Sequence, residues 1–217
     1  GVAVSSCEIV ETPVGNLEVD LDKRGGVAGE LAREGVEVKE MSKEVDEEEH
    51  SGEMQYPLIA LLLKKYNSAA KIVPLMVGST SPSISHKIGS VLSPHLFHPS
   101  AFTVVSSDFC HWGVRFSYSP FSQHSEISDM ITRLDHEGMT EIEKCSPGGF
   151  VEYLRRTKNT ICGRHPIECF LFAVEAKQGG EGGGGNFQFV RYEKSSEVVD
   201  IQDSSVSYAG GVFYGGS

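Results

Sequence analysis

The sequence predicts an α/β fold, with residues 1–217 forming one domain whose mixed sheet is flanked by helices. Its composition, 39% hydrophobic and 23% charged over 217 residues, is typical of a globular protein that buries a core. Apolar, β-branched runs at 70–78 and 100–109 flank a helical pattern at 81–97. Strand, helix and strand in this order indicate a parallel βαβ unit, with both strands buried.

The residues before this unit predict a strand pair and two helices. Residues 1–20 alternate apolar and polar side chains around the turn sequence TPVGN, which predicts two strands. Residues 21–35 predict a short helix, which its glycines weaken. Residues 50–67 predict a second helix, with Ser51 as its N-cap and Pro57 in or near its first turn.

The residues after the unit predict further helices and a final pair of strands. The helices are expected at 122–138, 140–146, 147–159 and 165–178, the last with Pro166 near its start. The glycine-rich run 179–185 predicts a flexible surface loop. Strands at 186–195 and 204–214 complete the chain.

Charge and composition exclude several functional classes. The net charge of −11, with no basic stripe, argues against nucleic-acid binding, and the acidic run 37–50 predicts a solvated loop or helix entry. No apolar run is long enough to span a bilayer, so no membrane span is expected. The five cysteines form no CxxC pair or even framework, which favours reduced thiols in the cytoplasm and disfavours structural zinc.

The stretch SSDFCHW follows the run predicted to end a buried strand, where ligand sites of α/β sheets form. Asp108 and His111 are three residues apart and can point into one crevice, where the carboxylate fixes the imidazole for base catalysis or metal ligation. Alternatively, Asp108 caps the next turn and His111 is a core residue. Alternation points Cys110 away from the crevice and leaves Trp112 as a packing residue.

Three more polar stretches abut predicted elements. In NTICGRHPI, Cys162, Arg164 and His165 precede a helix whose N-terminus favours thiolates and anions, although a cysteine there is often a packing residue. In EEEHSGEMQYP, Glu49, His50 and Glu53 can present carboxylate and imidazole groups at the start of one helix. Helix capping by Ser51 explains these residues almost as well. The turn-forming stretch IQDSSVSYAGG is the third. Together the four stretches suggest one shared pocket. A hydrolase using Cys162 as nucleophile, His111 as base and Asp108 as orienter is one possible reading.

These stretches carry a resemblance. EEHSGEMQYP, VVSSDFCHWG followed by RFSYS, NTICGRHPI and QDSSVSYAGG occur in this order in the Memo family, mediators of cell motility, with KIVPLMVG also in register. The resemblance covers nearly the whole chain, and the stretches DFCHWG and NTICGRHPI match the animal-type members. Memo proteins resemble class III extradiol dioxygenases, so the resemblance implies a mixed α/β fold with a non-haem metal pocket.

The resemblance implies a metal-binding protein that takes iron or copper in the cytoplasm, with the nucleus as a second location. It implies docking of phosphotyrosine-bearing receptor tails or signalling proteins, and a role in receptor tyrosine kinase signalling to the cytoskeleton. Cys162 matches a family metal ligand, while Asp108 and His111 match pocket residues, with His111 the second expected metal ligand. Arg164, His165 and His50 are expected to contact a cofactor. An active extradiol dioxygenase or other oxidoreductase is the alternative, which the thiolate ligand disfavours.

The chain also departs from the family pattern. The family has two further histidines upstream, one in a Pro-His-Ala-Gly stretch and one in a Ser-His-His stretch, and this chain contains neither. We therefore expect a Memo-like domain without its N-terminal segment. The expected consequences are an incomplete metal site, an exposed sheet edge and poor stability.

Overall fold

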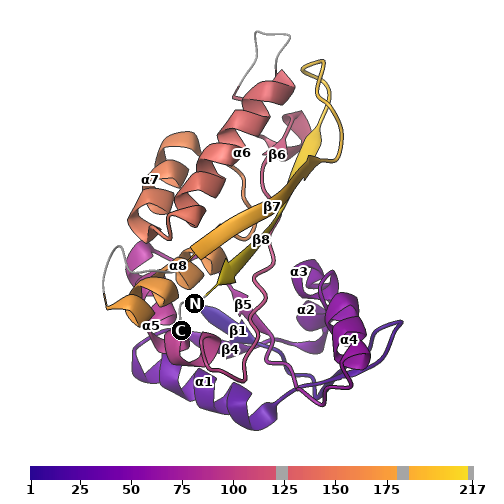
Figure 1. The fold of residues 1–217 in the computed structure, drawn as a ribbon, viewed down its shortest axis with the longest axis vertical. Helices are drawn as coiled ribbons and strands as arrows, with labels where there is room; N and C mark the ends of the chain where they lie inside the picture. The colour runs from indigo at the N-terminus through magenta and orange to yellow at the C-terminus, as the bar shows by residue number, and fades with distance from the viewer. Residues whose placement is uncertain (121–126, 180–185, 215–217) are drawn as a thin grey trace.

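The computed structural model describes residues 1–120, 127–179 and 186–214. It confirms a mixed α/β architecture, but the strands form three small sheets and not the single mixed sheet that the sequence predicts (Figure 1). The strands of the first two sheets are only two or three residues long. No helix in these ranges is long and apolar enough to cross a membrane.

The first sheet has the order β4-β1-β5. Its central strand β1 (Val2–Val4) pairs in parallel with β4 (Val38–Glu40) and antiparallel with β5 (Leu75–Val77). Helix α1 (Leu21–Arg33) lies between β1 and β4 in sequence, so the parallel βαβ unit exists here and not around residues 81–97. This sheet packs with α1 and α5 (Pro82–Leu96) in one core cluster, which is formed by Val2, Val27, Leu31, Val36, Ile88, Leu92 and Cys169.

The helix predicted at 21–35 is confirmed as α1, while residues 1–20 form three strands where two are predicted. Strands β2 (Ile9–Val10) and β3 (Leu17–Glu18) pair antiparallel around the TPVGN turn. Helix α1 forms despite its glycines, because the Asp20 side chain accepts the N–H of Lys23 and caps its start.

The helix predicted at 50–67 is two short helices, and a third lies in the acidic run before it. Helix α2 (Lys43–Glu48) occupies part of the acidic run, and it is followed by α3 (His50–Glu53) and α4 (Tyr56–Lys65). The N-cap of α3 is Glu49, whose carboxylate accepts the N–H of Ser51, so the prediction that Ser51 is the cap is wrong. Pro57 lies in the first turn of α4, as expected.

Helix α5 (Pro82–Leu96) confirms the pattern at 81–97, but the buried strand predicted at 100–109 is wrong. The chain there forms no ladder, and Phe102 is 85% exposed. A strand forms only where a neighbouring strand supplies hydrogen bonds. The expected neighbour of residues 100–109, β5, pairs with β1 and not with this segment. The next strand, β6, is the dipeptide His111–Trp112, which pairs with β8.

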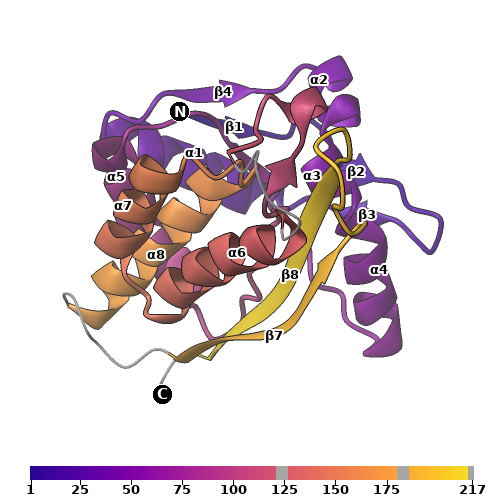
Figure 2. The ribbon, with the colours of Figure 1, turned by 90° about the horizontal axis from the view of Figure 1, so that it is seen from above.

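The C-terminal half packs helices on an antiparallel sheet of order β6-β8-β7. Figure 2 shows that the helices lie side by side on one face of the long β7–β8 pair. Within the described residues, the helices predicted at 122–138 and 140–146 are one helix, α6. Residues 122–126 of the first predicted helix and residues 180–185 of the predicted loop lie outside the described ranges. The bounds are α6 Ile127–Glu143, α7 Pro147–Thr157, α8 Arg164–Gln178, β7 Asn186–Lys194 and β8 Ser205–Tyr214, with a 3-10 turn at Val114–Phe116.

Gly89→Ala is predicted to lower the free energy of unfolding. A Cβ at Gly89 would lie 2.5 Å from the carbonyl oxygen of Cys169 and 2.6 Å from Cβ of Phe172, where α5 crosses α8. Such overpacking costs about 1–3 kcal/mol. Urea unfolding measures the effect.

The matched control is Gly25→Ala in α1, where no atom lies within 4 Å of the added Cβ. Alanine favours the helix there by about 1 kcal/mol, so this variant is expected to gain stability. If Gly89→Ala is as stable as Gly25→Ala, the close crossing of α5 and α8 is wrong.

Candidate functional site around Cys162 and His111

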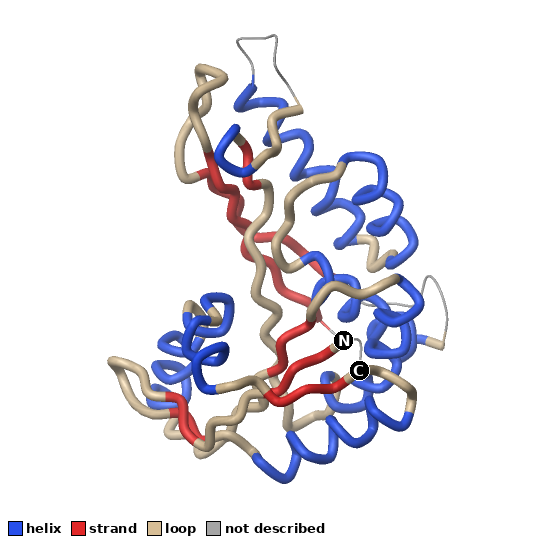
Figure 3. Tube along the Cα trace, turned by 180° about the vertical axis from the view of Figure 1, so that it is seen from behind, coloured by secondary structure: helices blue, strands red, loops and turns tan. Residues whose placement is uncertain are grey.

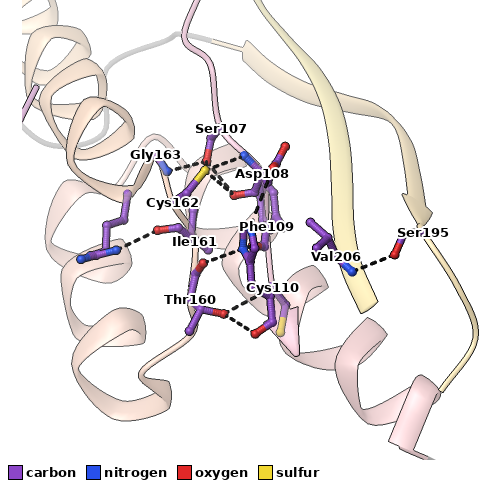
Figure 4. A network of polar contacts seen from close by, with 12 residues as sticks. Ser107, Asp108, Phe109, Cys110, Thr160, Ile161, Cys162, Gly163, Ser195 and Val206 are labelled. Carbon is purple, nitrogen blue, oxygen red and sulfur yellow. Dashed lines mark hydrogen bonds and ion pairs between the residues drawn. The ribbon is translucent and has the colours of Figure 1, made fainter. Parts of the chain in front are cut away.

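Two predicted stretches meet at the start of α8. Residues 106–112 lie against the loop 159–163 that joins α7 to α8 (Figure 4). The N–H of Gly163 donates to Oγ of Ser107 at 3.0 Å, and a Cβ on Gly163 would lie 2.5 Å from Cβ of Ser107. Glycine is therefore required for the two backbones to approach this closely.

The Cys162 thiol lies in this junction. Its Sγ accepts the backbone N–H of Asp108 at 3.1 Å and lies 3.9 Å from Oγ of Ser107, as Figure 4 shows. Cys162 is also two residues before Arg164, the first residue of α8. The sulfur therefore lies beside a backbone N–H donor and the start of a helix, a position where it can meet a metal ion or a substrate.

Cys162 is the exposed cysteine of the five. Burial raises the pKa of the Cys169 thiol to about 12 and raises that of Cys110 further, and it also raises the pKa values of Cys7 and Cys145. Cys110 is fully buried, which agrees with the prediction that it points away from the crevice. The candidate chemistry therefore centres on Cys162.

His111 is held with one ring nitrogen committed to the backbone. Its Nδ1 lies 3.0 Å from the carbonyl oxygen of Phe109 and 3.1 Å from that of Thr160. Carbonyl oxygens only accept, so Nδ1 carries a proton, and Nε2 holds the lone pair of the neutral ring. Oδ2 of Asp108 lies 3.8 Å from Nε2, so the two side chains are neighbours.

Thr160 fixes the position of His111. Its Oγ1 accepts the backbone N–H of His111 at 2.8 Å and donates to the carbonyl oxygen of His111 at 3.0 Å. Phe116 packs edge-on against the imidazole, with the ring centroids 5.2 Å apart. The imidazole is therefore oriented by backbone and packing contacts as well as by Asp108.

A buried carboxylate lies beneath the site. Asp135 of α6 accepts the N–H of Cys110 at 3.3 Å and Nδ2 of Asn159 at 2.9 Å through Oδ1, and the hydroxyl of Tyr192 at 2.9 Å through Oδ2. These donors belong to both site segments and to β7. Burial raises the pKa of Asp135, while hydrogen bonds, foremost from Ser207, oppose the rise.

Sequence reasoning missed Asp135, although a signal existed. Residues 127, 131, 134 and 138 are the buried face of α6, and Asp135 follows Ile131 by four residues, which is the same face. A carboxylate on the apolar face of a helix requires buried partners.

The other predicted site residues lie elsewhere. The guanidinium of Arg164 donates to the carbonyl oxygen of Ile161 at 3.1 Å, and Nδ1 of His165 lies 3.2 Å from Oγ1 of Thr80. Burial lowers the pKa of His165. His50 is exposed on α3, with its ring against the carbonyl oxygen of Glu48. No described contact joins these three side chains to Cys162 or His111, and their role in cofactor binding stays a prediction.

The remaining polar stretch, IQDSSVSYAGG, leads into β8 beside the site. Asp203 accepts the N–H groups of Val199 and Asp200, and these hydrogen bonds lower its pKa. Asp203 therefore forms a turn, while Ser205 pairs with Trp112 of β6.

The geometry does not assemble a Cys-His-Asp triad. Among the described residues, no hydrogen bond joins Cys162 to His111, and Asp108 faces Nε2, the nitrogen that would have to accept the thiol proton. The donors do not form a complete metal centre either. In the described part of the chain, no three His, Cys, Asp or Glu side chains converge as ligands. Cys162 and His111 offer one sulfur and one nitrogen donor.

The chain is similar to named proteins over nearly its whole length. The family model described as Memo-like protein matches residues 1–212. The protein memo-1 homolog of Caenorhabditis elegans is 40% identical over 218 residues, which cover 99% of this chain and 60% of the worm protein. Protein MEMO1 of Homo sapiens is 42% identical over 210 residues, 96% of this chain and 69% of the human protein. Protein MEMO1 of Danio rerio is 41% identical with the same coverage.

Asp135→Ala is predicted to lower the free energy of unfolding by about 1–3 kcal/mol, because it leaves the buried N–H of Cys110 without an acceptor. Asn159 and Tyr192 each lose one hydrogen bond but keep Tyr153 and Ser207 as partners. Asp135→Asn is predicted to lose less, because its amide oxygen still accepts from Cys110 and Asn159. Urea unfolding at pH 7 measures both, and equal losses would contradict the role of the acceptor.

The pH dependence gives a second readout of the same carboxylate. Because the folded-state pKa of Asp135 is raised, its contribution to stability is fully present below the unfolded-state pKa and is lost as the pH rises through the folded-state value. The stability of the wild type relative to Asp135→Asn is therefore predicted to fall as the pH rises above the ordinary pKa range of an aspartate, near 4. A difference that increases over this range would contradict the raised pKa.

Proposed function

The chain belongs to the Memo-like protein family, and from that premise we propose that it is a metal-binding protein in which Cys162 and His111 provide ligands for iron or copper. The observation that carries the proposal is the pair of donors at the start of α8. The thiol is exposed beside a backbone N–H donor. Nδ1 of His111 faces two carbonyl oxygens, which leaves Nε2, 3.8 Å from Oδ2 of Asp108, as the nitrogen that can bind a metal.

The chemistry of these donors fits such a metal. Thiolate and imidazole together suit iron, copper and zinc. A ligating histidine commonly donates its other N–H to a carbonyl oxygen, which is the arrangement of His111. Among the described residues, no three His, Cys, Asp or Glu side chains converge as ligands, so no reaction step is assigned to the metal.

The wider role proposed here rests on family membership. We propose one Memo-like domain over residues 1–217, with a fold like that of the class III extradiol dioxygenases. We also propose that the protein acts in the cytoplasm and the nucleus, where it binds phosphotyrosine-bearing receptor tails and relays receptor signals to the cytoskeleton. Ring cleavage by an extradiol dioxygenase is less favoured, because the donors are one thiolate and one imidazole where that chemistry uses two histidines and a carboxylate.

Cys162→Ser is predicted to weaken iron and copper binding by about 100-fold, because it removes a ligand that contributes more than a supporting residue. His111→Gln is predicted to do the same. Competition titrations of the purified chain with Fe(II) and Cu(I) chelators, under reducing and oxygen-free conditions, measure the affinities.

Cys145→Ser is the matched control, since it removes a half-buried thiol at the end of α6 without touching the site. It is expected to leave both affinities unchanged. If Cys162→Ser and Cys145→Ser bind each metal as tightly as the wild type, the proposal is wrong.

A further inference from the structure

Four polar side chains lie together where α5 crosses α8. They are Thr80 in the loop before α5, Ser85 on α5, and His165 and Glu168 on α8, and we call them the α5–α8 polar cluster. Ser85 is fully buried and Glu168 is only 4% exposed. Buried polar groups need hydrogen-bond partners inside the protein, because water cannot supply them.

Hydrogen bonds link these four side chains in one series. Oγ1 of Thr80 lies 2.8 Å from Oγ of Ser85 and 3.2 Å from Nδ1 of His165. The Ser85 hydroxyl is also the hydrogen-bond partner of the Glu168 carboxyl group. The series therefore runs from Glu168 through two hydroxyls to one nitrogen of the His165 ring.

The two ends of the series each leave one atom without a partner. Among the described residues, Nε2 of His165 and Oε1 of Glu168 are buried and make no hydrogen bond. The two residues are three positions apart on α8, so their side chains lie on the same face of the helix, one turn apart. A hydrogen bond between these two atoms would close the series into a ring.

The number of hydrogens decides whether the ring can close. The closed ring has four contacts, and each contact needs one hydrogen. A neutral acid at Glu168, the two hydroxyls and a neutral His165 ring supply one hydrogen each, which satisfies every contact. An ionised carboxylate beside a neutral imidazole leaves one contact without a hydrogen, while a neutral acid beside an imidazolium brings one hydrogen too many.

The charges around the cluster favour the neutral pair. Burial raises the pKa of Glu168, and the hydrogen bond from Ser85 opposes this rise only in part. Burial, followed by the positive charges of Arg164 and the Gly1 amino group, lowers the pKa of His165. No lysine or arginine of the described residues pairs with Glu168.

Few other ionisable groups face the cluster. Figure 3 shows from behind that the N-terminus lies at the end of a strand beside the helices. Burial raises the pKa of the Cys169 thiol to about 12, so this thiol stays uncharged while the pair titrates. The groups that face the cluster in the described structure are Arg164 and Cys169 on α8, the amino group of Gly1, and His86 on α5, whose ring packs edge-on against Phe172.

We propose that the α5–α8 polar cluster is a buried proton-binding site, in which Glu168 stays a neutral carboxylic acid and closes a ring of hydrogen bonds with Nε2 of His165. When the pH rises, Glu168 releases its proton to water, the ring loses one hydrogen, and one of its contacts opens. Ionisation of this single group therefore weakens the crossing of α5 and α8. The site is independent of the metal ligands.

Isotope-edited NMR of the full chain measures the protonation of the pair directly. The carboxyl carbon of Glu168, identified by the loss of its signal in Glu168→Gln, is followed as the pH is raised from acidic to mildly alkaline values. We expect a titration midpoint above the ordinary glutamate value of 4.5, and a neutral His165 ring at the pH where Glu168 starts to lose its proton. A midpoint at or below 4.5, or a charged ring at that pH, overturns the proposal.

Stability gives a second measurement, with Glu168→Gln as the reference, because its amide also supplies one donor and one acceptor to the ring. A raised folded-state pKa contributes stability that is fully present below the unfolded-state value and is lost as the pH rises through the folded-state value. The free energy of unfolding of the wild type relative to Glu168→Gln is therefore expected to fall as the pH rises above 4.5. A difference that grows with pH contradicts the neutral acid.

A double-mutant cycle tests whether His165 and Glu168 contact each other. His165→Leu, Glu168→Leu and the double variant are unfolded in urea at a pH where Glu168 is protonated, and the cycle cancels the apolar gain of each leucine. We expect the two changes to be coupled by about threefold or more in the unfolding equilibrium constant. The matched cycle pairs His165→Leu with Glu175→Leu, further along α8, and is expected to show no coupling. Equal coupling in the two cycles, or none in the first, overturns the ring.

Discussion

Buried Asp135 accepts hydrogen bonds from three parts of the chain that are far apart in sequence. A carboxylate removed from water must have its lone pairs satisfied, and here Cys110, Asn159 and Tyr192 supply the donors. The first two of these residues lie in the segments that carry His111 and Cys162. Satisfying one buried group therefore brings the two halves of the candidate site together.

The contacts above the carboxylate depend on this junction. Gly163 allows the backbone of the α7–α8 loop to touch Ser107. The hydroxyl of Thr160 forms hydrogen bonds with both the N–H and the carbonyl oxygen of His111. The thiol of Cys162 then meets the N–H of Asp108. Side chains on loops acquire a defined geometry in this way, because a rigid and buried network supports them.

Sequence patterns predict most helices. Polar residues at the ends of apolar runs, together with the family resemblance, indicate the two segments that carry Asp108, His111 and Cys162, and these segments lie against each other in the structure. Sequence patterns failed where the structure of a segment or the position of a side chain depended on hydrogen-bonding partners elsewhere in the chain. The run 100–109 has strand propensity, but no described strand pairs with its middle. His165 and Arg164 follow Cys162 closely, yet the first turn of α8 directs them to Thr80 and Ile161. Asp135 was missed because its partners come from distant segments.

The central claim is that Asp135 couples the two site segments. Hydrogen exchange of the backbone amides of Cys110 and Asp108, compared between the wild type and Asp135→Ala, tests it most directly. The amide of Cys110 bonds to Asp135, whereas that of Asp108 bonds only to Cys162. We predict that both amides lose protection together while those of the first sheet, around Val4, are unchanged. Loss of protection at Cys110 with full protection at Asp108 would contradict the coupling.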